Sequence, residues 1–150
     1  MYPKKLIWEK VLPLDKLTEL TVDIYKELQK TNIFHLWLQG ELGTGKTTIS
    51  KELLYHIGLD KHIKVTSPSF TLMSEYKIKN EWYAHLDLYR YTKDTKNIDL
   101  EDIFGLHEYN GYIVEWPKNV TIEGIKPSHQ LNINYTNNSK NRKYQLYLVN

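Results

Sequence analysis

Apolar residues recur along this chain with two periods, and these periods predict where its helices and strands lie. A spacing of three to four residues predicts an amphipathic helix over residues 15–30, with Asp15 as its N-cap, and a second helix over 49–57 that ends at Gly58. A short helix is predicted over 99–104. Apolar runs and apolar–polar alternation predict strands over residues 6–12, 33–38, 64–67, 72–78, 82–87, 111–116, 131–135 and 144–148.

A glycine-rich segment connects the 33–38 strand to the 49–57 helix. From residue 40 it reads Gly-Glu-Leu-Gly-Thr-Gly-Lys-Thr, which is the spacing of a P-loop. Glycines let backbone N–H groups turn toward phosphate oxygens, and the helix that begins there adds the positive end of its dipole. Lys46 would reach the β- and γ-phosphates, and the Thr47 hydroxyl would ligate Mg²⁺. The segment predicts a site for a nucleoside di- or triphosphate, and a plain glycine turn is the alternative.

This motif, in its place between a strand and a helix, predicts the fold class. We expect an α/β protein with a P-loop NTPase-type sheet, parallel core strands, helices on both faces, and antiparallel hairpin additions that include a C-terminal β-hairpin. The whole chain, 1–150, is predicted to be a single P-loop ATPase domain. The residues expected to contact the nucleotide in the loop are Glu41, Leu42, Gly43, Thr44, Gly45, Lys46, Thr47 and Thr48.

Composition excludes several kinds of site. The chain has no cysteine, so disulfides, thiolate catalysis and cysteine-based zinc sites are excluded. The formal charge is +2, from 20 basic and 18 acidic residues, which is too balanced to indicate nucleic-acid binding by itself. No run of about 18 apolar residues and no signal peptide is visible, so we expect a cytoplasmic protein that does not bind membranes.

Two acidic residues stand where predicted strands end. Asp87 follows Tyr-Ala-His-Leu, and Glu115 follows Tyr-Ile-Val. A P-loop ATPase needs an acid at the end of a strand beside the P-loop strand, where it holds Mg²⁺ directly or through water. The pattern does not decide which acid serves the metal, and the other would position or activate the attacking water. Each acid alone would also fit an ordinary polar strand end.

Three further features have both a functional and a structural interpretation. The hydroxyl-rich segment 67–71, which includes Ser69, is a loop that would reach the γ-phosphate and Mg²⁺, or an ordinary turn. His85 is interpreted as a hydrogen-bonded structural residue. Arg90 would pair with a phosphate, with Asp87 or with a partner protein, or form a surface ion pair.

The scarcity of arginine separates the competing functions. Kinases of nucleosides and metabolites commonly bring several arginines to the phosphates, but this chain has only Arg90 and Arg142. No Asn-Lys-x-Asp segment for guanine is present, which disfavours a GTPase. A nucleotide-gated binding module without turnover is the non-enzymatic alternative, and the two strand-end acids argue against it.

Four segments in this order and spacing resemble the TsaE (YjeE) family, small P-loop ATPases of bacterial tRNA threonylcarbamoyladenosine (A37) modification. These segments are Gly-Glu-Leu-Gly-Thr-Gly-Lys-Thr-Thr (40–48), Ser-Pro-Ser-Phe-Thr-Leu (67–72), His-Leu-Asp-Leu-Tyr-Arg (85–90) and Val-Glu-Trp-Pro (114–117), and Gly105 after the short acidic helix also fits. The chain departs from the family with Thr44 in place of alanine and Ser69 in place of threonine, and neither change removes a needed chemical group.

The resemblance implies a function. The family hydrolyses ATP with Mg²⁺ and works with TsaD and TsaB, which transfer a threonylcarbamoyl group to tRNA, so tRNA would be reached only through that complex. Carried over by position, the site residues are Lys46 and Thr47 for phosphates and metal, Asp87 for the metal, Glu115 near the γ-phosphate, Ser69 in a switch-like loop, and Trp116 beside the nucleotide. Trp116 would serve equally as a core residue. With Arg90 as the only well-placed arginine finger, we expect slow hydrolysis alone and faster hydrolysis in the complex.

Overall fold

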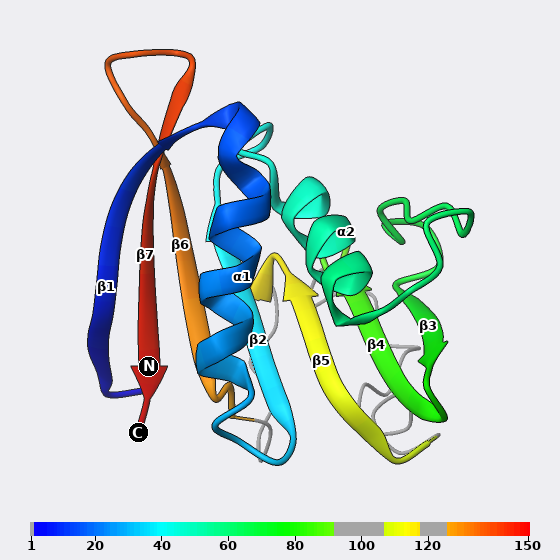
Figure 1. Cartoon of the computed structure of the whole chain (residues 1–150). Helices are drawn as coiled ribbons and strands as arrows, with labels where there is room; N and C mark the ends of the chain where they lie inside the picture. The colour runs from blue at the N-terminus through cyan, green and yellow to red at the C-terminus, as the bar shows by residue number, and fades with distance from the viewer. Residues whose placement is uncertain (1, 92–106, 118–125) are drawn as a thin grey trace.

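One mixed sheet and two helices make up the part of the chain that the structure describes, namely residues 2–91, 107–117 and 126–150 of the computed structural model (Figure 1). The strands are β1 (Lys4–Pro13), β2 (Phe34–Gly40), β3 (Met73–Ile78), β4 (Glu81–Asp87), β5 (Tyr109–Glu115), β6 (His129–Tyr135) and β7 (Asn141–Val149). The helices are α1 (Leu17–Leu28), which follows a 3₁₀ turn at Leu14–Lys16, and α2 (Lys46–Ile57).

The sheet has parallel strands at its centre and antiparallel strands at both sides. Its order is β1-β7-β6-β2-β5-β4-β3. The central strand β2 runs parallel to β5 and β6, and β5 runs parallel to β4. The antiparallel pairs are β1–β7, β6–β7 and β3–β4. This confirms the predicted sheet, including the hairpin of β3 and β4 and the C-terminal hairpin of β6 and β7.

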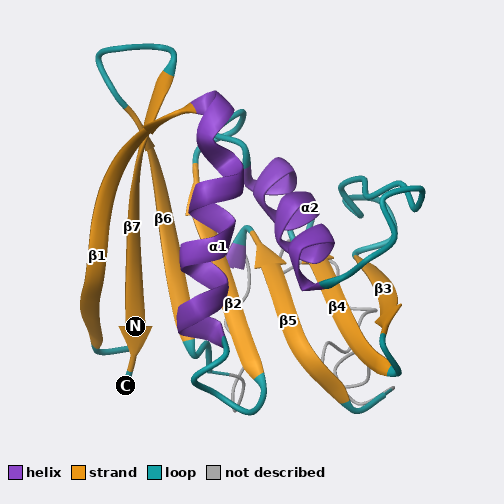
Figure 2. Ribbon diagram, viewed as in Figure 1, coloured by secondary structure: helices purple, strands orange, loops and turns teal. Residues whose placement is uncertain are grey.

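Both described helices pack on the same face of the sheet (Figure 2). Leu36 and Leu38 of β2 share one buried cluster with apolar residues of α1 and α2, whereas Val114 of β5 belongs to a second, aromatic-rich cluster. The prediction of helices on both faces is therefore not met by α1 and α2. The short helix predicted over 99–104 lies outside the described residues.

Alternation along the strands decides which polar residues face the helices. Successive strand residues point to opposite faces, so Glu115 points to the same face as Ile113, which packs with α2. On β4, His85 and Asp87 lie on the face of Tyr83, which belongs to the same cluster. The two strand-end acids are therefore on the face of the sheet where α2 begins.

Two predictions about the elements were wrong. Residues 64–67 do not form a strand, because Val65 is the only buried side chain of that segment and nothing pairs with it before Pro68. Asp15 does not cap α1, because it lies inside the 3₁₀ turn that precedes the helix. The other predicted elements within the described residues are present, with ends shifted by a few residues.

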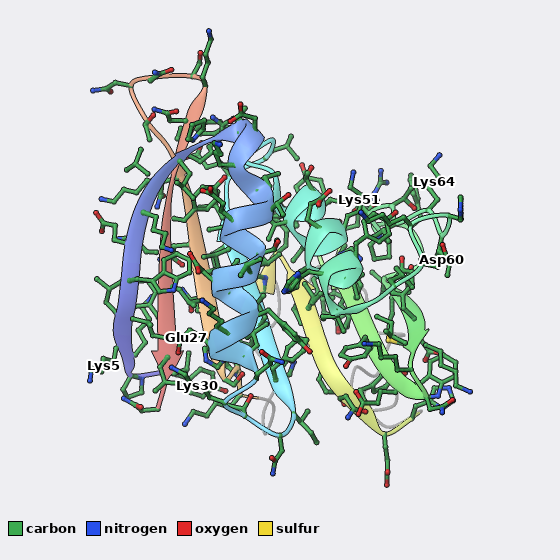
Figure 3. All side chains as sticks on the ribbon, viewed as in Figure 1. Lys5, Glu27, Lys30, Lys51, Asp60 and Lys64 are labelled. Atoms are coloured by element: carbon green, nitrogen blue, oxygen red, sulfur yellow. The ribbon has the colours of Figure 1, made fainter. Side chains whose placement is uncertain are left out.

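Charged side chains such as Lys5, Lys30, Asp60 and Lys64 lie exposed at the outside of the molecule (Figure 3). Lys30 Nζ lies 2.8 Å from Glu27 Oε2 at the end of α1, where the lysine is largely exposed. An exposed pair of this kind contributes about 0–1 kcal/mol. Within the described residues, neither helix has the length and apolar character needed to cross a membrane.

A buried histidine on β2 predicts acid sensitivity of the fold. Burial lowers the pKa of His35 to about 4 from an ordinary value near 6.5. Between these two pH values the histidine binds a proton in the unfolded chain but not in the folded chain. The free energy of unfolding therefore falls by up to about 3 kcal/mol as the pH falls from about 6.5 to 4. Urea unfolding at several pH values would measure this loss. The slope should shrink in His35→Gln, and an unchanged slope would show that other groups cause it.

Candidate nucleotide site

The segment from Gly40 to Thr47, called here the glycine loop, joins the end of β2 to the start of α2. Gly43 and Gly45 have φ angles of 80° and 104°, the left-handed region that favours glycine. At Gly40, a Cβ atom would lie 2.6 Å from Thr44 Oγ1 and 2.8 Å from the carbonyl oxygen of Ile133. The fold of the loop therefore requires glycine at three positions.

Thr44, which departs from the family pattern, stabilises the loop from inside. Its hydroxyl donates to the carbonyl oxygen of Glu41 at 2.8 Å, and its side chain is buried. The added methyl and hydroxyl groups therefore lie within the loop. Tyr135 of β6 also braces the loop, because its hydroxyl donates to the carbonyl oxygen of Leu42 at 2.6 Å.

Lys46, the first residue of α2, folds back over the loop. Its Nζ donates to the carbonyl oxygens of Gly40 and Glu41 at 2.7 and 2.9 Å, and the residue is 4% exposed. Burial lowers the pKa of the Lys46 ammonium, and the nearby carboxylates of Glu115 and Asp87 offset this only in part. An anion at the loop would give the ammonium a stronger partner than two carbonyl oxygens.

The side chains of Asp87 and Glu115 lie on the same face of the sheet at the ends of two parallel strands. They occupy directly paired positions of β4 and β5 and are 4% and 1% exposed. Asp87 accepts hydrogen bonds from the Ser67 hydroxyl and from the backbone N–H of Tyr89. Of β4 and β5, only β5 pairs with β2, so Glu115 is the acid on the strand beside the glycine loop strand. Two buried like charges at paired positions repel each other unless a cation or a proton lies between them.

Glu115 connects directly to the start of α2. The Thr47 hydroxyl donates to Glu115 Oε1 at 2.8 Å, and Glu115 Oε2 is hydrogen-bonded to Nε2 of His85. The predicted metal-binding hydroxyl and one of the two predicted acids are thus in contact. The role expected for His85, a hydrogen-bonded buried residue, agrees with its position, although its partner is a predicted site residue.

A hollow of about 480 Å³ opens over these groups. It is lined by Leu42, Gly43, Gly45, Lys46, Thr47, Thr48, Ser67, Ser69, Asp87, Tyr89, Arg90, Glu115 and Trp116. The structure therefore brings most of the predicted site residues together, including Ser69 from the hydroxyl-rich segment. The guanidinium carbon of Arg90 lies 3.9 Å from the centre of the exposed Phe70 ring, so Arg90 is at the rim of this hollow.

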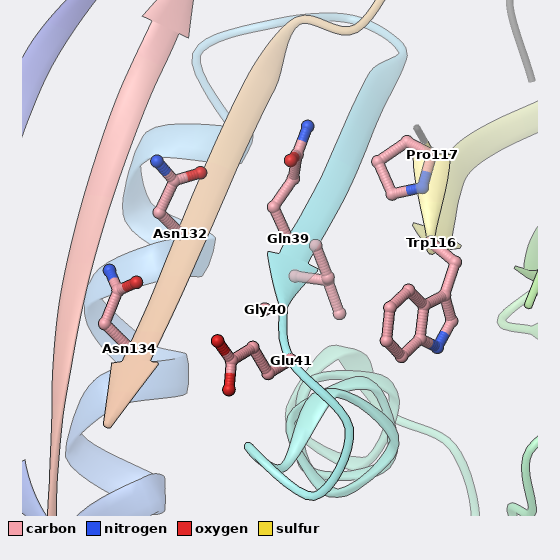
Figure 4. Close-up of a pocket in the computed structure, with 8 residues that line it drawn as sticks. Gln39, Gly40, Glu41, Trp116, Pro117, Asn132 and Asn134 are labelled. Atoms are coloured by element: carbon pink, nitrogen blue, oxygen red, sulfur yellow. The ribbon is translucent and has the colours of Figure 1, made fainter. Parts of the chain in front are cut away.

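Trp116 separates this hollow from a second one. Its φ angle of 59° is unusual for a bulky residue, and its ring lies 3.9 Å below Lys46 Nζ. The second hollow, about 350 Å³, lies along β2 and β6 on the face away from α1 (Figure 4). It is lined by Leu38, Gln39, Gly40, Glu41, Trp116, Pro117, Asn132 and Asn134. The side chain of Glu41, which was predicted to contact the nucleotide, therefore lies at this second hollow.

A third hollow, about 250 Å³, lies on the other side of the glycine loop and was not predicted. Its walls are Leu14, Leu17, Gly43, Thr44, Gly45, Thr48, Arg142 and Tyr144. It shares Gly43, Gly45 and Thr48 with the first hollow, so the loop has open space on both sides. Arg142 also lies beside the loop, so Arg90 is not the only arginine there. The guanidinium carbon of Arg142 lies 4.5 Å from the centre of the Tyr135 ring. The pairing of β7 with β1, which brings Arg142 there, gives no local signal in the sequence.

The fold and this arrangement define the class: an α/β protein of the P-loop NTPase type, with a glycine loop between a central parallel strand and a helix. A family model described as "Threonylcarbamoyl adenosine biosynthesis protein TsaE" matches residues 13–144, and the chain belongs to this family. The resemblance seen in the sequence is thereby confirmed. The chain is a member of a family of tRNA threonylcarbamoyladenosine biosynthesis.

Individual relatives agree. The tRNA threonylcarbamoyladenosine biosynthesis protein TsaE of Haemophilus influenzae is 30% identical over 123 residues, which are 79% of this chain and 74% of the relative. The protein of the same description from Bacillus subtilis is 34% identical over 98 residues, 65% of this chain and 58% of the relative. The crystal structure of Bacillus subtilis YdiB superposes with a TM-score of 0.64 at 25% identity and covers 100% of this chain and 88% of that one.

Proposed function

We propose that this protein is a Mg²⁺-dependent ATPase that hydrolyses ATP at the glycine loop to support a TsaD–TsaB complex in threonylcarbamoyl transfer to tRNA. The observation that supports this most directly is the convergence of Lys46, Thr47, Asp87 and Glu115 on one hollow. Family membership supports the pathway, and the preference for adenine rests on the family alone. The protein would act in the cytoplasm and would meet tRNA only through its partners.

The residues at the hollow fit Mg²⁺. This ion prefers oxygen ligands, binds one or two carboxylates, and usually keeps several waters and substrate phosphate oxygens. Thr47, Asp87 and Glu115 offer such oxygens, and two buried carboxylates at paired positions attract a cation. Among the described residues, no group of three or more His, Cys, Asp or Glu side chains would hold a metal by itself. That agrees with an ion whose remaining ligands are water and nucleotide.

Each side chain then has a defined task. The backbone N–H groups of the glycine loop and the start of α2 would bind the phosphates, and Lys46 would leave its carbonyl partners for the β- and γ-phosphates. When bound, Mg²⁺ neutralises charge on the phosphate oxygens. Asp87 and Thr47 would hold the ion, and Glu115 would orient the attacking water. Ser69 reaches the same hollow from the segment after α2.

The third hollow offers space for the nucleoside end. It continues from the glycine loop on the side opposite Asp87 and Glu115, where Leu14 and Leu17 give an apolar wall and Arg142 a polar one. A nucleotide whose phosphates lie on the loop would reach it without crossing the sheet. The base would then lie near the start of β7, on the other side of the loop from Asp87 and Glu115.

The proposal is tested by measuring release of phosphate from ATP and from GTP, with and without Mg²⁺ and with and without TsaD and TsaB. We expect slow, Mg²⁺-dependent and ATP-selective hydrolysis that rises when the partners are added, because Arg90 rests on Phe70 at the rim in the isolated chain. Fast hydrolysis that the partners do not change would contradict partner activation. Phosphate transfer to a small hydroxyl compound would replace the proposal with a kinase, and nucleotide binding without turnover would replace it with a binding module.

A further inference from the structure

A chain of hydrogen bonds runs from the glycine loop into the core of the sheet. Thr47 of α2 donates to one oxygen of Glu115, and the other oxygen is bonded to Nε2 of His85 on β4. His85 is paired with Ile113, two residues before Glu115 on the same face of the sheet, so the two side chains are diagonal neighbours. His85 is 0% exposed and does not line the 480 Å³ hollow, so it reaches the site only through Glu115.

The second nitrogen of His85 shows that this residue is not present for packing alone. In the described part of the chain, the buried Nδ1 atom of His85 has no hydrogen-bond partner. A buried polar atom without a partner costs free energy of folding, so an apolar side chain of similar size would serve packing better. Within the described residues, the bond to Glu115 is the one hydrogen bond of the His85 imidazole, and its effect falls on the carboxylate.

Glu115 needs such a partner to keep its orientation. A glutamate has three rotatable side-chain bonds, and its carboxylate here is buried opposite the like charge of Asp87. With Thr47 as its only partner, the carboxylate would be free to turn about the remaining bond or to move away from Asp87. The imidazole occupies the second oxygen and leaves the first one directed at Thr47 and the hollow.

We propose that His85 is a positioning residue: it holds the Glu115 carboxylate against Thr47 and thereby sets the geometry in which the metal and the attacking water are received. The proposal rests on the proposed function for the identity of the reaction, but the positioning itself is a property of the protein without ligands. It assigns to His85 a role beyond the structural one that its sequence context suggested.

Two amides of different length separate positioning from packing. The side-chain nitrogen of glutamine lies about where Nε2 of histidine lies, whereas that of asparagine lies about where Nδ1 lies. His85→Gln should therefore keep the bond to Glu115, and His85→Asn and His85→Leu should lose it. Partners of this kind typically change metal affinity or activity by about 10–100-fold. We expect kcat to fall and the half-saturating Mg²⁺ concentration to rise by that factor in Asn and Leu variants, with little change in KM for ATP.

The experiment has three readouts on the full chain. Crystal structures of the nucleotide-free variants report the side-chain conformation of Glu115, calorimetric titration with Mn²⁺ and a non-hydrolysable ATP analogue reports metal affinity, and phosphate release reports kcat and KM. His35→Gln, the same change at a buried histidine on β2, which β5 separates from β4, is the matched control and should leave all three unchanged. Thermal unfolding identifies any variant that loses its fold. If His85→Leu unfolds, the comparison of His85→Asn with His85→Gln still tests the proposal.

The outcomes separate the two proposals. Displacement of Glu115 from Thr47 and weaker Mn²⁺ binding in Asn and Leu variants, with recovery in the Gln variant, support positioning. A Glu115 conformation and a metal affinity that stay at wild-type values in His85→Leu overturn it, even if the protein is an active ATPase. If wild type neither binds nor hydrolyses ATP, the proposed function fails, and the crystal structures alone decide whether His85 positions Glu115.

Discussion

Replacing Lys46 with alanine is expected to lower the rate of ATP hydrolysis by about 10²–10³-fold, the cost of removing one pre-positioned charge from a developing anionic transition state. The change should not unfold the protein. Burial of the Lys46 charge costs the empty protein free energy of folding, whereas the nearby carboxylates of Glu115 and Asp87 favour that charge. Because these two effects oppose each other, thermal unfolding without nucleotide should shift little.

The diagnostic result for Lys46→Ala is the loss of stabilisation by nucleotide. A ligand at 100 times its Kd stabilises the folded state by about 2.7 kcal/mol, and this increment should shrink in the variant. Lys51→Ala, on the same helix but not at the hollow, is the matched control and should keep both activity and nucleotide stabilisation (Figure 3). Equal hydrolysis by the Lys46→Ala protein would refute the assignment of the glycine loop as the phosphate site.

Neutralising either strand-end acid should move stability and activity in opposite directions. Asp87→Asn and Glu115→Gln each remove one of two buried, paired carboxylates, which relieves their repulsion when Mg²⁺ is absent. The same changes remove an oxygen charge that the metal or the attacking water needs, and we expect hydrolysis to fall more than about 100-fold. The measurements are unfolding by urea without metal and phosphate release as a function of Mg²⁺ concentration.

The Mg²⁺ dependence of these two variants also identifies the metal ligand. If Asp87 holds the ion and Glu115 acts on it only through Thr47, the half-saturating Mg²⁺ concentration should rise most in Asp87→Asn and by about 10–100-fold in Glu115→Gln, and the reverse order would exchange their roles. Asp60→Asn, on the exposed turn after α2, is the control and should change neither quantity. Full activity in both variants would exclude a metal site between these strands.

Local patterns predicted the parts of the site that lie next to each other in sequence. The glycine spacing and its flanking strand and helix identified the loop, and the position of an acid at the end of an apolar run identified Asp87 and Glu115. Parallel strands bring their carboxyl ends to one edge of a sheet, and the register places the two acids at directly paired positions there. The roles of these residues in hydrolysis remain predictions.

What the sequence did not show depends on contacts between distant segments. Arg142 reaches the glycine loop because β7 lies between β1 and β6, and nothing local to residue 142 indicates that order. The bond between His85 and Glu115 likewise depends on the register between β4 and β5. The alternation of apolar and polar residues along a strand does not reveal this register. The error at Asp15 has a different cause, since the chain enters α1 through a 3₁₀ turn after Pro13 and leaves the acid inside that turn.

The central place of β2 has a consequence for the speed and order of folding. The neighbours of β2 are β5 and β6, which are encoded much later in the chain than the β2–loop–α2 unit. Closing such long loops costs entropy before any pairing energy is gained, and proteins dominated by distant contacts fold slowly. The hairpins β3–β4 and β6–β7 are local and can form early, whereas the parallel pairs that place Glu115 beside Thr47 must come late. On a chain that emerges from the ribosome, the helix and loop therefore precede the finished site, and a nucleotide bound at the glycine loop would stabilise the protein only after its last strands have docked.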